Sequence, residues 1–162
     1  MIYLDGKNCV IVDLPKAGKQ VVWQIRPLCP CCGGKLYKND VRTRVLFDFD
    51  GFDLTREYYL LTRWRCFSCN ETHIALPVNL FFFRRRLHVG LCEQLYEKPE
   101  NSIMGWMEEK TILSIQQAVQ RVDFQYTDVF GQQEAYGLKQ RPGWLSQMLL
   151  AMYPSRFPPV LH

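Results

Sequence analysis

The chain has 162 residues, of which 48% are hydrophobic and 22% are charged. This balance is that of a folded domain, and it excludes an intrinsically disordered, collagenous or coiled-coil chain. The length allows one domain of typical size or two very small ones. It leaves little room for a complete catalytic fold beside an accessory module, so we do not expect an enzyme.

The start of the chain does not combine basic residues with an apolar segment, and no run approaches the roughly 18 apolar residues that cross a membrane. The nearest candidate, Leu80–Phe83, is followed by Arg84. We therefore expect a soluble cytoplasmic protein without a membrane partner. In a reducing compartment, seven cysteines more often bind metal than form disulfides, and an odd number cannot all pair within one chain.

The net charge of +4 is unevenly distributed. Residues 26–86 carry +5, residues 1–25 carry +1 and residues 87–162 carry −2. Most of the cysteines also lie in the basic segment, so a positive surface is expected beside a metal site, as in proteins that contact phosphate. A solvated basic face without a partner is the alternative. Because four thiolates on one Zn²⁺ would lower the net charge to +2, nucleic-acid binding would depend on local patches.

Two C-x-x-C pairs form the clearest motif in the chain. Two intervening residues let a tight turn aim both sulfurs at one ion, and the residues that follow the pairs, Gly33 and Asn70, suit the positive φ that such turns need. Two such pairs are typical of a tetrahedral structural zinc site, with no open position for a catalytic water. Thiolate ligands also suit iron, and the sequence leaves this choice open. The predicted ligands of one structural Zn²⁺ are Cys29, Cys32, Cys66 and Cys69.

Other residues near the pairs leave alternatives open. Cys31 could replace either ligand of the first pair, although ligation by neighbouring residues would strain the turn. His73 is either a substitute ligand or a surface or packing histidine. A redox function is disfavoured because both pairs have the same form. Cys9 and Cys92 lie in strand-like and helix-like patterns, and we interpret them as small buried hydrophobic residues.

Several segments have the pattern of β-strands. Residues 2–4 and 9–12 flank Asp5-Gly6-Lys7-Asn8, which predicts a hairpin, and residues 21–25 predict a strand leading into the first cysteine pair. Residues 41–49 and 55–65 are rich in β-branched and aromatic residues and flank a turn signal at residues 50–53, which predicts a second hairpin.

Arginines recur at alternate positions of the second hairpin. Alternate residues of a strand share a face, so a suitable register would gather four guanidinium groups into one phosphate-sized patch. Acidic residues of the hairpin could neutralise part of it. The four residues are Arg42, Arg44, Arg63 and Arg65.

The second half of the chain is predicted to be helical. Three arginines, Arg84, Arg85 and Arg86, introduce a helix over about residues 85–97, and a short helix follows at about residues 101–107. A third helix, capped by Thr111, has an apolar stripe and presents Gln117 and Arg121 on its other face. The stripe comprises Ile112, Ile115, Val119 and Val122.

Three short helices of this kind are typical of a helix-turn-helix, here over about residues 85–123. Its last helix reads bases in the major groove, where Gln recognises adenine and Arg recognises guanine. A purely structural helical bundle is the alternative. Residues 125–141 are predicted to form a loop, a C-terminal helix is predicted over about residues 143–153, and residues 155–162 are predicted to form an extended tail.

These elements predict an α+β fold with a β-rich zinc-ribbon domain over residues 1–83 and a helical domain over residues 84–162. Three groups of residues suggest a family. They are Cys29-Pro30-x-Cys32-Gly33-Gly34, then Arg63-x-Arg65-Cys66-x-x-Cys69-x-x-Thr72-His73-x-x-Leu76-Pro77, then the arginine-rich entry to the helices.

In these motifs the chain resembles, over roughly residues 26–123, the transposase-type zinc ribbon followed by a helix-turn-helix. That arrangement is found in the N-terminal regions of insertion-sequence transposases and in small uncharacterised bacterial proteins. The resemblance implies zinc on the four cysteines and DNA binding in mobile-element or regulatory work. No acidic catalytic domain follows, and the helical segment lacks the basic residues usual in that family's recognition helix, so strand transfer is not expected.

We therefore expect a zinc-binding, DNA-binding protein without catalytic activity, with DNA preferred over RNA. The alternative is a zinc-stapled protein–protein interaction module, such as an adaptor subunit of a larger nucleoprotein complex, that docks through the aromatic residues Phe81–Phe83, Trp106 and Trp144. A ribbon that binds single-stranded RNA would instead stack bases on Tyr58, Tyr59 and Trp64. The residues expected to contact nucleic acid are Arg42, Arg44, Arg63, Arg65, Arg84, Arg85, Arg86, Gln117 and Arg121.

Overall fold

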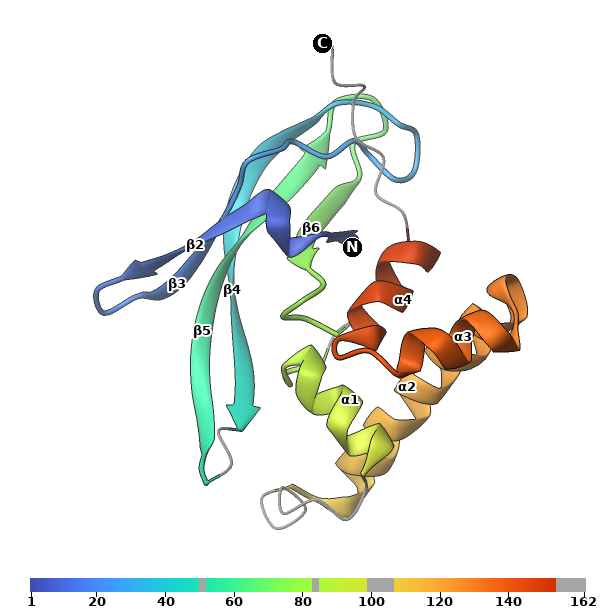
Figure 1. Cartoon of the computed structure of the whole chain (residues 1–162). Helices are drawn as coiled ribbons and strands as arrows, with labels where there is room; N and C mark the ends of the chain where they lie inside the picture. Colours follow the sequence, from blue (N-terminus) through green and yellow to red (C-terminus); the bar gives the residue numbers. More distant parts are fainter. Residues whose placement is uncertain (50–51, 83–84, 99–106, 154–162) are drawn as a thin grey trace.

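The structure is a computed structural model that describes residues 1–49, 52–82, 85–98 and 107–153. Within these residues, a strand-rich half is followed by four α-helices, which lie together on one side of the sheet (Figure 1). The fold is therefore α+β, as predicted. The elements are β1 (Ile2–Leu4), η1 (Gly6–Asn8), β2 (Cys9–Leu14), β3 (Gly18–Trp23), β4 (Leu36–Phe49), β5 (Leu54–Cys66), β6 (Thr72–Pro77), α1 (Val89–Glu97), α2 (Glu109–Phe130), α3 (Gln132–Lys139) and α4 (Trp144–Met152).

The strand β5 is the centre of the sheet. The strand order is β1-β6-β5-β3-β2. β6 and β3 pair with different parts of one edge of β5, and β4 pairs with the opposite edge of β5. The predicted hairpin is confirmed, because β4 and β5 are antiparallel from Leu36 opposite Cys66 to Phe49 opposite Leu54, with one irregularity between Lys38 and Asp40. β5 thus connects the second cysteine pair to the rest of the sheet.

The predicted N-terminal hairpin is wrong. β1 pairs in parallel with β6, with Ile2 opposite Ala75, whereas β2 pairs with β3. The intervening residues form the short helix η1, in which the side chain of Asp5 accepts a hydrogen bond from the backbone N–H of Lys7. All three residues of β1 are buried, and such a continuous apolar run is typical of a strand covered on both faces rather than of an exposed hairpin.

The helices differ from the prediction at both ends of α2, which begins at Glu109 with Glu108 as its N-cap instead of Thr111 and continues beyond residue 123. The apolar stripe of α2 is buried as predicted, but the predicted loop at residues 125–141 is wrong. α2 continues to Phe130 because Tyr126 extends the stripe, and Gly131, with a φ of 93°, separates it from α3. α1 begins at Val89 and α4 matches its prediction. The predicted helix at residues 101–107 and the predicted tail lie almost entirely outside the described residues.

Two hydrophobic clusters hold the fold together. The larger one joins the inner face of the sheet, through residues such as Tyr59 and Leu61, to all four helices. The smaller one lies beneath the cysteine pairs and comprises Ile2, Leu4, Cys29, Leu36, Trp64, Cys66 and Ala75. The predicted domain boundary near residue 83 stays a prediction, and the larger core is common to the segments on both sides of it.

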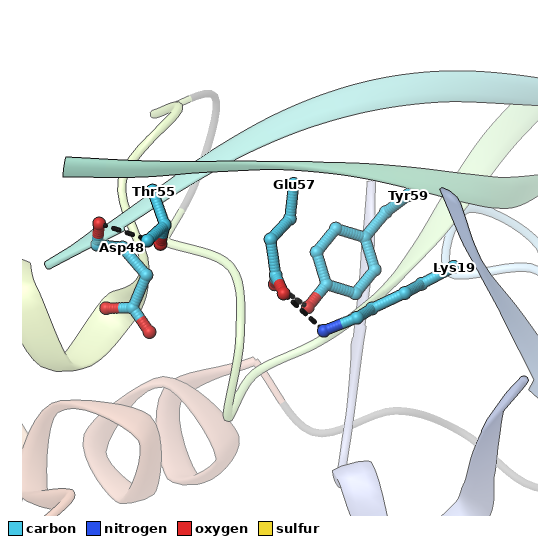
Figure 2. A network of polar contacts seen from close by, with 5 residues as sticks. All are labelled: Lys19, Asp48, Thr55, Glu57 and Tyr59. Atoms are coloured by element: carbon cyan, nitrogen blue, oxygen red, sulfur yellow. Dashed lines mark hydrogen bonds and ion pairs between the residues drawn. The ribbon is translucent and has the colours of Figure 1, made fainter. Parts of the chain in front are cut away.

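Polar contacts reinforce the inner face of the sheet. Figure 2 shows Glu57 of β5 accepting hydrogen bonds from the ammonium group of Lys19 on β3 and from the hydroxyl of Tyr59, the latter at 2.7 Å. Near the hairpin turn, the hydroxyl of Thr55 donates to the backbone carbonyl of Asp48 at 3.1 Å. In the part of the chain that the structure describes, no helix combines the length and hydrophobicity needed to cross a membrane.

Candidate metal centre

The two cysteine pairs lie in turns of the same construction. In the first turn the backbone N–H of Gly33 donates to the carbonyl of Cys29 at 2.8 Å, and in the second the N–H of Asn70 donates to the carbonyl of Cys66 at 3.2 Å. Gly33 and Asn70 have φ angles of 72° and 64°. The positive φ predicted for both residues is confirmed, and it explains why glycine and asparagine follow the pairs.

The fold brings the four predicted ligand sulfurs together. All four lie within 4.8 Å of one another, and Cys29 Sγ to Cys69 Sγ and Cys32 Sγ to Cys66 Sγ are each 3.5 Å. Sulfurs around a tetrahedral zinc ion, each about 2.3 Å from the metal, would be about 3.8 Å apart. The four cysteines could therefore hold one metal ion with only small adjustments.

The electrostatics of the four sulfurs also favour a cation. The backbone N–H groups of Cys69 and Ser68 lower the pKa of Cys66 to about 6. The N–H of Glu71 likewise lowers the pKa of Cys69, but burial and hydrogen bonds with the other three sulfurs raise it to about 12. Without a metal, the four cysteines therefore do not all ionise to thiolates together. A bound divalent cation would stabilise all four thiolates.

His73 is a neighbour of the cluster that the sequence left undecided. It lies in β6, is buried, and has its Nε2 3.3 Å from Cys29 Sγ. Burial lowers the pKa of this imidazole. Cys29, Cys31 and His73 form a second set of possible ligand atoms within 4.8 Å of one another, although Cys31 is exposed. In the structure, His73 is therefore placed either to bind a metal ion itself or to donate a hydrogen bond to the predicted ligand Cys29.

Cys9 and Cys92 lie outside the cluster. Burial raises the pKa of Cys92 to about 12, and this cysteine is buried in α1 as predicted. Cys9 is half-buried, and its thiol donates to the carbonyl of Gly6 at 3.3 Å.

The four arginines of the hairpin share one face. Arg42 and Arg44 of β4 lie opposite Leu61 and Tyr59 of β5, while Arg63 and Arg65 lie two and four residues beyond Leu61 on the same strand. Residues directly opposite in an antiparallel pair, and residues two apart on a strand, point to the same side. The observed register therefore brings the four arginines onto one face, as the predicted patch requires.

Asp40 is the acidic residue that neutralises part of this patch, and sequence reasoning missed it. It binds Arg63 through two hydrogen bonds of 2.8 and 2.5 Å and lies 3.6 Å from a guanidinium nitrogen of Arg42. The sequence places it just before the arginine alternation, but only the register puts it opposite Arg63. Asp40 therefore reduces the positive charge of this face.

The remaining predicted contact residues are arranged around α2. Arg85 donates to the carbonyl of Ser114 at 3.1 Å and, with Arg121, lines a pocket of about 400 Å³. Gln117 and Arg121 are exposed on α2, and Arg86 is exposed. Arg84 lies outside the described residues. The structure thus places the predicted residues in two groups, one on the hairpin and one around α2.

The aromatic residues proposed for docking are buried where the structure describes them. Phe81, Phe82 and Trp144 are fully buried, because they fill the core between the sheet and the helices, while Phe83 and Trp106 lie outside the described residues. Of the aromatics proposed to stack on RNA, Tyr59 and Trp64 are buried and Tyr58 is exposed.

Residues 29–115 match a family described as a domain of unknown function, DUF6431. The chain belongs to the DUF6431 family. The matched segment covers more than half of the chain and contains the four-cysteine cluster, the β4–β5 hairpin, His73 and α1. No curated protein matches the chain, and no solved structure matches it.

Proposed function

We propose that this DUF6431 protein binds one structural Zn²⁺ through Cys29, Cys32, Cys66 and Cys69 and that the resulting zinc ribbon binds DNA in mobile-element or regulatory work, without catalysis. The observation that carries the proposal is the register of the β4–β5 hairpin, which aligns four arginines on one face beside the cysteine cluster.

The position of the cluster supports a structural role for the metal. One cysteine pair precedes β4 and the other begins at the last residue of β5. A single ion would therefore clamp the open end of the hairpin, opposite its turn. Four sulfurs fill a tetrahedral shell and leave no position for a reacting water, which supports a structural rather than a catalytic metal.

The arginine face supports DNA binding through phosphates. Arginines two apart on a strand are about 7 Å apart, and the Arg42 side chain is 54% exposed. Asp40 offsets one of the four charges, and the segment that contains them, residues 26–86, carries +5. Gln117 and Arg121 on the exposed side of α2 are the proposed base-contacting residues, in a helix-turn-helix that starts with α1.

The test is a salt titration of binding to a random-sequence DNA duplex and to a single-stranded RNA of equal length, followed by fluorescence anisotropy. The variant is Arg42→Ala/Arg44→Ala. The matched control is Arg56→Ala, because Arg56 is on the same hairpin but faces the other side, where its guanidinium lies over the Tyr58 ring at 4.9 Å.

We expect duplex binding whose logarithmic salt slope falls by about 2 in the double variant, since each phosphate contact contributes roughly 0.9. Arg56→Ala should leave the slope unchanged. Tighter binding to the RNA would favour the RNA-binding ribbon. If neither nucleic acid binds at low salt, the proposal of DNA binding fails and the zinc-stapled protein–protein interaction module becomes the better explanation.

A further inference from the structure

The end of the sheet beside the cysteine pairs carries an exposed aromatic residue. Phe67 lies between the predicted ligands Cys66 and Cys69 and is 69% exposed. Its backbone N–H donates to the carbonyl of Lys35 at 3.1 Å, and its ring packs against the ring of Tyr37, with 4.4 Å between the ring centroids. The cysteine turn and Tyr37 therefore hold an aromatic ring in place while most of its surface stays in water.

An arginine without an acidic partner lies beside this ring. Arg65 of β5 is directly opposite Tyr37 on β4 and Thr72 on β6, so the three residues form a row on one face of the sheet. In the next row Arg63 is bound by Asp40. The guanidinium group of Arg65, by contrast, has no ion pair or hydrogen bond within the described residues, and its Nε is buried without a partner. Its charge is therefore available to an anion.

The ring and the arginine are accessible to the same ligand. The connection between β5 and β6 lies at the end of the β4–β5 hairpin that is remote from α1 and α2 (Figure 1). Tyr37 and Arg65 are partly exposed and Thr72 is exposed, whereas Leu61, on the same face of β5, is buried against the helices. We call the following four residues the aromatic–arginine site: Tyr37, Arg65, Phe67 and Thr72.

We propose that the aromatic–arginine site binds an unpaired nucleotide of DNA, with its base stacked on Phe67 and its phosphate on Arg65. A nucleotide combines a flat π-face with a negative charge, and the site offers a partner for each. Within a duplex both faces of a base are covered by its neighbours, so the ring requires a base that is out of the stack. This inference rests on the DNA binding proposed above, and it narrows the substrate to DNA that contains unpaired bases.

The surroundings of the site favour a nucleic acid over a peptide. The site belongs to residues 26–86, which carry +5, and such a segment attracts a polyanion. The hydroxyl of Thr72 can donate to a phosphate oxygen beside Arg65. Arg63 lies about 7 Å farther along β5, so a single strand that leaves the ring can continue along the arginine face. Stacking on Phe67 accepts any base, because every base has a π-face.

The experiment compares two DNA duplexes with identical blunt ends, of which one is fully paired and the other has a short single-stranded gap at its centre. Fluorescence anisotropy measures the binding of the zinc-loaded full chain to each. We expect the gapped DNA to bind more tightly by roughly 5- to 150-fold, the factor that corresponds to the free energy of stacking one base. Phe67→Leu keeps an apolar side chain in the turn and removes the flat ring, so it should bring this ratio close to one without weakening binding to the paired duplex. Phe67→Trp should restore the ratio.

The matched control is Phe52→Leu, because Phe52 is 85% exposed at the turn of the same hairpin, at the end opposite the cysteine pairs. This variant should keep the wild-type ratio. Elemental analysis checks that each variant retains its zinc. A 2-aminopurine base in the gap, whose fluorescence is quenched when it stacks, reports the contact directly, and the quenching should be lost in Phe67→Leu.

The outcomes separate this inference from the proposed function. If the wild type binds both DNAs equally, or if Phe67→Leu keeps the preference for the gap, the unpaired-base site is overturned while the proposed DNA binding stands. If neither DNA binds, the proposed function fails and this inference fails with it. Tighter binding to the same gapped duplex made of RNA would overturn the assignment to DNA.

Discussion

The imidazole Nε2 of His73 lies 3.3 Å from the Sγ of Cys29, and both residues are buried. The contact joins β6 to the first cysteine turn, across 44 positions in the sequence. An imidazole N–H that donates to a ligating thiolate orients the sulfur and stabilises its negative charge, and hydrogen bonds of this kind are stronger away from water. We infer that His73 is a positioning residue for the metal centre.

Replacing His73 by Ala should lower zinc affinity by roughly 10- to 100-fold, because partners of this kind typically contribute that much. Competition with a chromophoric chelator measures the effect, and Cys31→Ser serves as the control that should leave affinity unchanged. The absorption spectrum of the Co²⁺-loaded wild type separates four-sulfur ligation from three sulfurs and one nitrogen. The latter spectrum would make His73 a ligand instead.

Cys66→Ser should abolish stoichiometric zinc binding and lower the melting temperature, since the free energy of metal binding contributes directly to folding. Cys9→Ser provides the control, because Cys9 lies outside the cluster. Elemental analysis gives the zinc content, and thermal unfolding with and without a chelator gives the stability. A Cys66→Ser protein that keeps one zinc ion would refute the proposed ligand set.

Asp40→Asn should tighten binding to duplex DNA if the arginine face contacts phosphates, because Arg63 and Arg42 would lose their carboxylate partner. The cost in stability should stay below about 1 kcal/mol, as is usual for partly exposed ion pairs. Anisotropy at fixed salt and urea unfolding measure the two effects. Weaker DNA binding with intact stability would mean that Asp40 holds the arginines in their binding geometry.

Ile115→Ala should destabilise the protein by about 2 to 5 kcal/mol, the usual range for removing a large buried aliphatic side chain. Ile115 is 2% exposed in the stripe of α2, whereas Leu113, two residues earlier, is 49% exposed. Leu113→Ala is therefore the matched control and should change stability by less than about 0.5 kcal/mol. Equal losses in denaturant unfolding would contradict the observed face of α2.

The Lys19–Glu57–Tyr59 network predicts a pH dependence. Burial alone would raise the pKa of Glu57, but hydrogen bonds from Lys19 and Tyr59, with a smaller effect of His88, lower it below 4.5. A depressed carboxyl pKa adds stability that is present above the unfolded value near 4.5 and is lost as the pH falls through the lower folded value.

The difference in unfolding free energy between the wild type and Glu57→Gln should therefore shrink on acidification through this window and stay constant above it. Denaturant unfolding at a series of pH values measures it. A difference that is independent of pH would show that Glu57 contributes by packing alone.

Local chemistry made much of the metal centre predictable. The C-x-x-C spacing and the residues Gly33 and Asn70 encode a turn that forms within a few positions, and the structure shows these turns with the expected φ angles. The β4–β5 hairpin was predictable for the same reason, since a turn signal separates two strands of matching pattern.

What could not be predicted depends on contacts between distant segments. The pairing of β1 with β6 and the approach of His73 to Cys29 follow from where β6 lies beside β5, which no short window of sequence reveals. Asp40 was missed because a register irregularity between Lys38 and Asp40 sets its cross-strand partner. The helix α3 was missed because glutamine- and tyrosine-containing residues were taken for a loop, although Ala135 and Leu138 bury their side chains against the larger core.

The pairing of β1 with β6 also has a consequence for the order of folding. Ile2 meets Ala75, so this strand pair must close a loop of roughly 70 residues, whereas β4 and β5 meet across a short turn. A metal ion bridging Cys29 and Cys69 would halve that loop, which lowers the closure cost by less than about 1 kcal/mol. Ile2 and Leu4 pack in the same cluster as Cys29 and Cys66, and burying each contributes about 1.5 to 3 kcal/mol. The apolar surface around Cys29 and Cys66 therefore contributes more to the docking of β1 than the shortening of the loop does.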